Sequence, residues 1–131
     1  VALLRRHTQY AEPLSASHPL AHMFWRVVSG FTADERRKLI RFAWGQDRLP
    51  ADDTEFERTA TRLLVKPSSS FRGDPNRALP KADTCFFNIE LPPYTTEIAM
   101  RERLHLAISS CSDIDADEPI EADMSRGFRA E

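Results

Sequence analysis

Two cysteines are present in this 131-residue chain, and one of them, Cys85, has the surroundings of a nucleophile. It lies where a long polar stretch gives way to alternating apolar residues, which predicts the junction of a loop and a strand. Such a position holds a side chain rigidly and leaves it open to solvent. An ordinary cysteine is a few per cent thiolate at neutral pH, which is enough to attack an activated acyl group such as a thioester. Amide hydrolysis is a poorer fit, because a protease must also protonate a poor leaving group.

The other candidates for catalysis are weaker. Cys111 falls on the apolar face of an expected helix, where a free cysteine behaves as a small hydrophobe. None of the four histidines has a spacing to Cys85 that indicates a catalytic pair, so a cysteine hydrolase would need a fold that brings His105 within hydrogen-bond reach of the sulfur. The scattered histidines predict no metal site and the widely separated glycines form no phosphate-binding loop, so no cofactor is expected.

The composition indicates one globular domain without a strongly charged surface. A hydrophobic fraction of 41% and a charged fraction of 29% suit a chain with one modest core. The net charge of -2 offers no attraction for nucleic acid or an anionic membrane, so neither is expected as a partner. No apolar stretch approaches the roughly 18 residues of a membrane span, and the N-terminus does not resemble a secretory signal. Without a disulfide framework, a reducing cytoplasm or nucleus is the expected compartment.

Three amphipathic helices are expected to support the region of Cys85. The first spans residues 17–30, with Ser17 as its cap, and the second spans residues 32–45, opening with a capping box between Thr32 and Glu35. The third begins at Thr95 or Thr96 and ends at Cys111. The apolar faces predicted by spacing are Leu20, Met23, Phe24, Val27, Val28 and Phe31; Leu39, Ile40 and Ala43; and Met100, Leu104, Ala107, Ile108 and Cys111.

Two strands and two loops are expected between these helices. Residues 62–66 favour a strand that ends before Pro67, whereas the segment from residue 56 up to that strand is compatible with helix or strand. Alternation of Phe87, Ile89 and Leu91 predicts a second strand over residues 84–91. Residues 47–53 and 68–80 are expected to be loops, and the second of these leads the chain to Cys85.

Beyond residue 111 the sequence becomes acidic. Residues 112–123 contain six Asp and Glu side chains and no Lys or Arg, so residues 112–131 are expected to form a mobile acidic tail. Phe128 is the only aromatic residue in this tail, where it has no apolar neighbours to pack against. An isolated aromatic on a polar tether suggests an anchor for another surface.

The segment around Cys85 resembles the active-site signature of the C-terminal catalytic lobe of HECT-type ubiquitin ligases. The Leu79-Pro80 pair, the Thr84-Cys85-Phe86 motif and the Leu91-Pro92-Pro93-Tyr94 segment are the residues that match most specifically. The resemblance extends over nearly the whole chain, and the double phenylalanine after Cys85 is most similar to the large HERC-type members. Further matching positions are Phe24, Trp25, Val27, Val28, Leu39, Phe42, Gly45, Arg48, Pro50, Met100, Arg103, Leu104, Ala107 and Ile108.

The resemblance implies an α/β fold in which a small β-sheet is flanked by helices and Cys85 lies on an exposed loop at the sheet edge. It divides the chain into a hinge or linker over residues 1–16, the lobe over residues 17–111 and the tail over residues 112–131. It also implies that Cys85 accepts ubiquitin as a thioester from a conjugating enzyme and passes it to a lysine of a protein substrate. The larger N-terminal lobe that recruits the conjugating enzyme in this family is not part of these 131 residues.

Four residues are expected to support transfer by this resemblance: Asp83, Thr84, Phe128 and Glu131. Many family members have histidine where this chain has Asp83. A carboxylate there would either oppose the Cys85 thiolate by like-charge repulsion or receive the proton of an attacking lysine. Phe128 and Glu131 occupy tail positions at which the family has a phenylalanine required for transfer and, in some members, a functional acid. The alternative is a HECT-like module that binds ubiquitin or a partner without forming a covalent bond.

Overall fold

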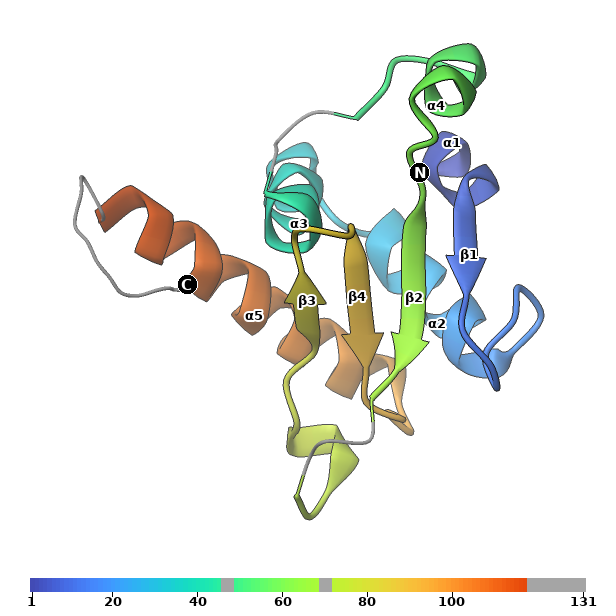
Figure 1. Cartoon of the computed structure of the whole chain (residues 1–131). Helices are drawn as coiled ribbons and strands as arrows, with labels where there is room; N and C mark the ends of the chain where they lie inside the picture. The colour runs from blue at the N-terminus through green and yellow to red at the C-terminus, as the bar shows by residue number, and fades with distance from the viewer. Residues whose placement is uncertain (46–48, 69–71, 118–131) are drawn as a thin grey trace.

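The computed structural model describes residues 1–45, 49–68 and 72–117, with side chains described as far as residue 110. Its strands form one sheet, and three of its helices are stacked beside that sheet (Figure 1). The helices are α1 (Ala2–Arg6), α2 (Pro19–Ser29), α3 (Ala33–Trp44), α4 (Asp53–Thr59) and α5 (Glu97–Asp117), with a short 3-10 helix, η1 (Pro75–Arg77). The strands are β1 (Thr8–Tyr10), β2 (Leu63–Pro67), β3 (Lys81–Asp83) and β4 (Asn88–Leu91).

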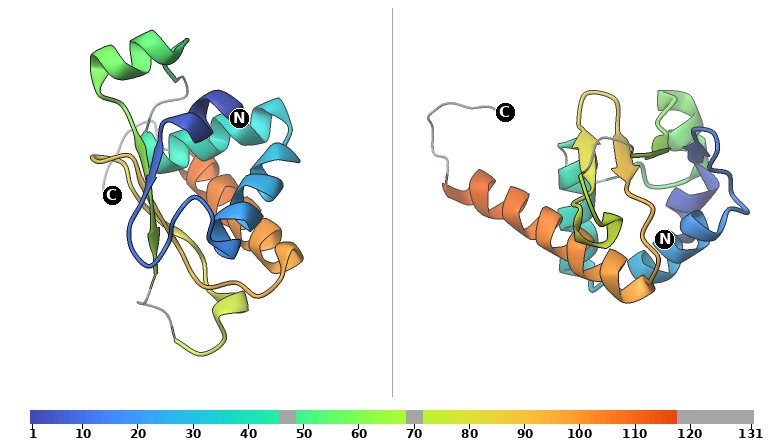
Figure 2. Two further views of the ribbon diagram at one scale, coloured as in Figure 1. Left: turned by 90° about the vertical axis from the view of Figure 1, so that its right-hand side faces the viewer. Right: turned by 90° about the horizontal axis from the view of Figure 1, so that it is seen from below.

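The sheet is mixed and has the strand order β1-β2-β4-β3. Strand β2 pairs in parallel with both β1 and β4, whereas β3 and β4 form an antiparallel hairpin at one edge. Helices α2, α3 and α5 cover one face of the sheet, as the two turned views show (Figure 2). The predicted small sheet flanked by helices is therefore confirmed. Within the described residues, no helix combines the length and the apolar character that a membrane crossing requires.

The core is built from the helix faces that the apolar spacing predicted. Buried side chains include Leu20, Phe24, Val27, Val28, Leu39, Ile40, Ala43, Met100, Leu104 and Ile108. The predicted capping box of α3 is present, because Thr32 and Glu35 exchange hydrogen bonds of 2.8 and 3.1 Å. Helix α2, in contrast, is capped by His18 and not by Ser17, since the His18 Nδ1 atom accepts from the Leu20 N–H at 3.0 Å. An imidazole nitrogen provides the same acceptor as a hydroxyl at this position.

The first sixteen residues contribute to the same sheet and core. Strand β1 pairs with β2 in the register Thr8 to Leu63, and both Leu4 and Leu14 are buried. Trp25, which the apolar spacing did not place in the core, is also buried and donates through its Nε1–H to the Tyr10 hydroxyl at 2.9 Å. A three-residue strand is too short to show a periodic pattern, so its role in the sheet was not visible in the sequence.

The end of the sheet opposite the β3–β4 turn is closed by a group of polar contacts. The Asn76 side chain accepts from the Thr95 N–H at 2.8 Å and donates to the Thr95 hydroxyl at 2.7 Å. The Tyr94 hydroxyl donates to the Ala78 carbonyl at 2.6 Å, and burial raises the pKa of Tyr94 well above its usual range. These contacts tie the loop before β3 to the start of α5, so the Leu91-to-Tyr94 segment stabilises the connection between them.

Two predicted boundaries differ from those in the structure. The strand predicted over residues 84–91 begins only at Asn88, because residues 84–87 form a turn. Helix α5 continues to Asp117, past Cys111, where the acidic tail was expected to start. A helix already nucleated gains a backbone hydrogen bond for each added residue, which lets it continue into a polar segment. The Cys111 side chain and residues 118–131, including Phe128 and Glu131, lie outside the described part of the chain.

Candidate functional site

Cys85 lies in the turn that joins β3 to β4. The two strands end in the pair formed by Asp83 and Asn88, and residues 84–87 connect them. Cys85 is exposed, and it is a free thiol. This hairpin is at the edge of the sheet, near the C-terminal end of α3 (Figure 1). The expected exposed position at the sheet edge is therefore present, although the residue is in a hairpin turn and not at the first position of a strand.

Hydrogen bonds to Asp83 define the backbone of this turn. The Asp83 carbonyl accepts from the Phe86 N–H at 3.2 Å, which closes a β-turn around Thr84 and Cys85. The Asp83 Oδ1 atom accepts from the Cys85 N–H at 3.1 Å. Four-residue hairpin loops are most often built around such a turn. Asp83 thus accepts hydrogen bonds from the backbone N–H of the nucleophile itself and from that of the residue after it.

Phe87 completes the turn in an uncommon conformation. Its φ of 54° lies in the left-handed region, which is rare for a bulky residue. The Phe87 side chain is only 3% exposed and stacks on Trp44, with 4.8 Å between the ring centroids and 14° between the ring planes. Its carbonyl accepts from the Leu64 N–H at 3.1 Å. A side-chain contact and a backbone contact together hold this residue in place.

The last turn of α3 supports the hairpin from a second side. Gly45 ends the helix with a φ of 78°, and a Cβ atom built on it would lie 3.5 Å from the Thr84 Cβ. Thr84 therefore packs against the helix end, one residue beyond the ring of Trp44. Positions at which the backbone must be left-handed favour glycine, which explains the residue at this helix end.

A hollow of about 230 Å³ opens beside the thiol. Phe86, which lines it, is 70% exposed, whereas Arg62 is the one charged side chain among the described lining residues. The lining residues are Trp44, Thr59, Ala60, Thr61, Arg62, Cys85, Phe86 and Phe87. They include no histidine, and the His105 Nε2 atom is instead 3.3 Å from the Glu35 carboxylate. The structure therefore provides no support for the cysteine hydrolase.

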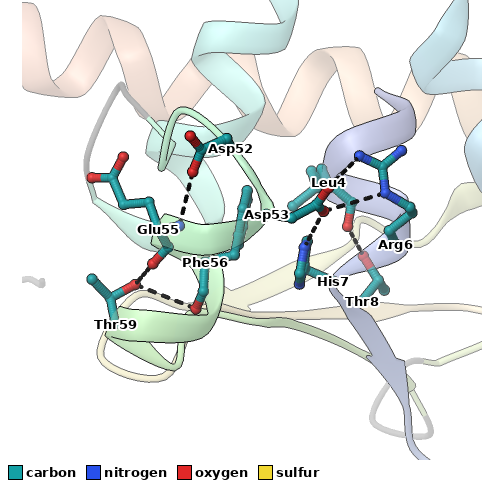
Figure 3. A network of polar contacts seen from close by, with 9 residues as sticks. All are labelled: Leu4, Arg6, His7, Thr8, Asp52, Asp53, Glu55, Phe56 and Thr59. Atoms are coloured by element: carbon teal, nitrogen blue, oxygen red, sulfur yellow. Dashed lines mark hydrogen bonds and ion pairs between the residues drawn. The ribbon is translucent and has the colours of Figure 1, made fainter.

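The wall formed by α4 is fixed to the N-terminal segment (Figure 3). The Asp53 carboxylate contacts the Arg6 guanidinium at 3.0 Å and the His7 Nε2 atom at 2.6 Å. The His7 ring also stacks on Phe56, with 4.4 Å between centroids. Hydrogen bonds from Arg6 and then from His7 hold the pKa of Asp53 below its ordinary value of 3.8. Because these partners are far apart in the sequence, no local sequence pattern indicated this network.

The structure brings together three of the residues predicted to act in transfer, namely Asp83, Thr84 and Cys85. Trp44 and Phe87 belong to the same site, although the sequence indicated only that they were apolar. Within the described residues, no group of three or more His, Cys, Asp or Glu side chains is arranged to hold a metal ion. The site is consequently one exposed thiol on a turn. Asp83 holds the backbone of this turn, and Thr84 and Phe87 pack against the end of α3.

The family model and the relatives described here belong to one family. A family model described as HECT-domain (ubiquitin-transferase) matches residues 1–115. The mouse (Mus musculus) E3 ubiquitin-protein ligase HERC2 is 32% identical over 105 residues, and the rat (Rattus norvegicus) E3 ubiquitin-protein ligase NEDD4 is 30% identical over 115 residues. The Arabidopsis thaliana E3 ubiquitin-protein ligase UPL1 is 30% identical over 110 residues. These matches cover 80%, 85% and 84% of this chain, but only 2%, 12% and 3% of the relatives.

Proposed function

Since this chain belongs to the HECT-domain (ubiquitin-transferase) family, we propose that it is the catalytic lobe that holds ubiquitin on Cys85. The observation that supports this most directly is the exposed thiol of Cys85 on a turn fixed by Asp83, Trp44 and Gly45. The expected likeness to HERC-type members agrees with the similarity to HERC2. Membership of the family makes the non-covalent binding module the less favoured function.

The first proposed step moves ubiquitin from one thiol to another. The Cys85 sulfur attacks the thioester carbon that links the C-terminal glycine of ubiquitin to a cysteine of the conjugating enzyme. The bond between that carbon and the conjugating enzyme's sulfur then breaks, and the released thiolate takes up the proton that Cys85 gave up. A thioester is replaced by a thioester, so the site needs no strong general base for this step.

The second proposed step forms an amide. A neutral lysine amine of the protein substrate attacks the carbon of the new thioester, and the Cys85 sulfur leaves as the thiolate. The amine proton passes to the thiolate or to another base, and ubiquitin is left in an isopeptide bond. The hollow beside Cys85 gives the incoming amine an open approach, and the described residues that line it include no carboxylate or imidazole.

Four further residues and a second lobe complete the proposed function. We propose that Thr84 supports transfer through its packing against Gly45, and that Asp83 does so through the turn. Phe128 is proposed to act as an anchor, helped by Glu131, when ubiquitin is delivered to lysine. The conjugating enzyme is proposed to bind a larger N-terminal lobe beyond these 131 residues. The whole ligase is proposed to act in the cytoplasm or nucleus.

One experiment tests the acceptor thiol. The 131-residue chain is incubated with conjugating enzyme charged with ubiquitin, and a ubiquitin adduct that reductant removes is measured. Cys85→Ser is expected to abolish the adduct or to convert it to an ester that resists reductant, while Cys111→Ser is expected to leave it unchanged. A reducible adduct that survives Cys85→Ser would exclude Cys85 as the acceptor. Ubiquitin binding without any adduct, both on this chain and on a complete two-lobed ligase, would instead support the non-catalytic module.

A further inference from the structure

Asp83 makes two contacts with the residues that surround the thiol. Its carbonyl accepts from the Phe86 N–H at 3.2 Å, and its Oδ1 atom accepts from the Cys85 N–H at 3.1 Å. The second contact is the more informative, because it involves the side chain and fixes the peptide nitrogen of the nucleophile itself. Asp83 is also the last residue of β3 and pairs with Asn88, so its own backbone is held by the sheet.

The direction of the Cys85 side chain follows from this contact. Cys85 is exposed, so side-chain packing restrains it little, and the orientation of its Cα–Cβ bond is set by the backbone of the turn. Once the Cys85 N–H is bound, rotation about a single side-chain bond is all that remains to place the sulfur. Small misplacements of a reacting atom are costly, because an acyl transfer requires the two atoms to approach along a defined line.

We propose that Asp83 is a positioning residue, whose side-chain oxygen holds the Cys85 backbone for both transfer steps and whose negative charge is dispensable. The proposal rests on the function proposed for Cys85 and defines how its neighbour serves that function. An N–H group needs an acceptor, and an amide oxygen provides one, although its hydrogen bond is weaker than that of a carboxylate oxygen. The competing role, that of a base for the attacking lysine, requires a carboxylate and cannot be filled by an amide.

Two substitutions at this position separate the roles. Asp83→Asn keeps the acceptor and removes the charge, so loading of Cys85 and discharge to free lysine are each expected to stay within about twofold of wild type. Asp83→Ala removes the acceptor, and both steps are expected to slow by roughly 3- to 10-fold, the range typical of one lost hydrogen bond. A general base would instead slow the lysine step alone by about 10²–10⁴-fold in Asp83→Asn.

The chain contains a matched control for the loss of such a contact. The Asp74 Oδ1 atom accepts from the N–H of Asn76, again two residues ahead, at 2.9 Å. Asp74 precedes η1, at the opposite end of β3 from the Cys85 turn (Figure 1). Asp74→Ala is expected to lower stability about as much as Asp83→Ala while leaving both transfer rates unchanged. Equal slowing in the two alanine variants would reduce the role of Asp83 to general stability and overturn the proposal.

A second measurement is independent of catalysis. Hydrogen exchange of the Cys85 amide, followed by NMR, is expected to be protected in wild type and in Asp83→Asn and to accelerate about 3- to 10-fold in Asp83→Ala. The proposal is overturned if the alanine variant keeps full protection, or if Asp83→Asn loses the lysine step alone. Absence of any adduct on wild-type Cys85 within a complete two-lobed ligase would contradict the function proposed for Cys85, and the exchange experiment on this chain would still decide whether Asp83 holds its amide.

Discussion

Phe87 combines a buried ring with a left-handed backbone, and replacing it by alanine or glycine separates these two contributions. Both substitutions remove the ring that is stacked on Trp44 at 4.8 Å, and loss of a buried phenylalanine costs about 3–5 kcal/mol. Alanine retains the cost of a φ of 54°, about 1–2 kcal/mol, whereas glycine does not. Glycine in turn gives the unfolded chain more conformational freedom, which lowers the free energy of unfolding by about 0.5–1 kcal/mol.

The glycine variant is therefore expected to be more stable than the alanine variant by roughly 0.5–1 kcal/mol, although strand residues ordinarily show the reverse order. Urea unfolding followed by far-UV circular dichroism measures both free energies, provided that the slopes of the transitions agree. Phe86→Ala is the matched control, because that neighbouring ring is 70% exposed and its loss should change stability by less than about 0.5 kcal/mol. An alanine variant more stable than the glycine variant would refute the left-handed conformation at this position.

Three further predictions concern the helix end, the salt bridge and the tail. Gly45→Ala is expected to lower the free energy of unfolding in urea by about 1–2 kcal/mol, because alanine is strained at a φ of 78°. The added Cβ atom would lie 3.5 Å from the Thr84 Cβ, an ordinary contact that adds no strain. Arg6 and His7 lower the pKa of Asp53, so this contact stabilises the fold above the unfolded-state pKa and is lost as the pH falls through the folded-state pKa. Asp53→Asn should therefore be less stable than wild type at neutral pH and converge with it in strong acid, as acid unfolding curves would show. In a complete ligase, Phe128→Ala should spare loading of Cys85 and slow discharge to lysine in single-turnover assays, with deletion of Glu131 having a weaker effect; equal lysine rates would contradict the anchor.

The sequence predicted the elements that have long, regular patterns. The apolar spacing of α2, α3 and α5 is matched by their buried faces, and the capping box at Thr32 marks the start of α3 correctly. The strand expected over residues 62–66 lies within one residue of β2, which spans Leu63–Pro67 and includes the proline expected to end it. These features depend on contacts within one helix or one strand, and local propensity and periodicity describe them directly.

The strand predicted over residues 84–91 is in part a turn, because the alternation of apolar residues continues through that turn. Phe87, Ile89 and Leu91 are all buried, as a strand over residues 84–91 would require. Phe87 nevertheless reaches the core from a left-handed turn, which a pattern of burial cannot reveal. The Thr84-Cys85-Phe86 motif directs attention to Thr84, Cys85 and the preceding Asp83, and their roles stay predictions. The contribution of Trp44 depends on packing between elements distant in the sequence.

The contact between Trp44 and Phe87 has a consequence for how sequences of this kind can diverge. An asparagine or glycine at position 87 would relieve the left-handed backbone but would leave the Trp44 ring without its partner. Without that stacking contact, an aromatic side chain at position 44 would no longer be favoured. Among related chains the two positions should therefore change together, with an aromatic pair in some lineages and a turn-forming residue opposite a smaller side chain in others.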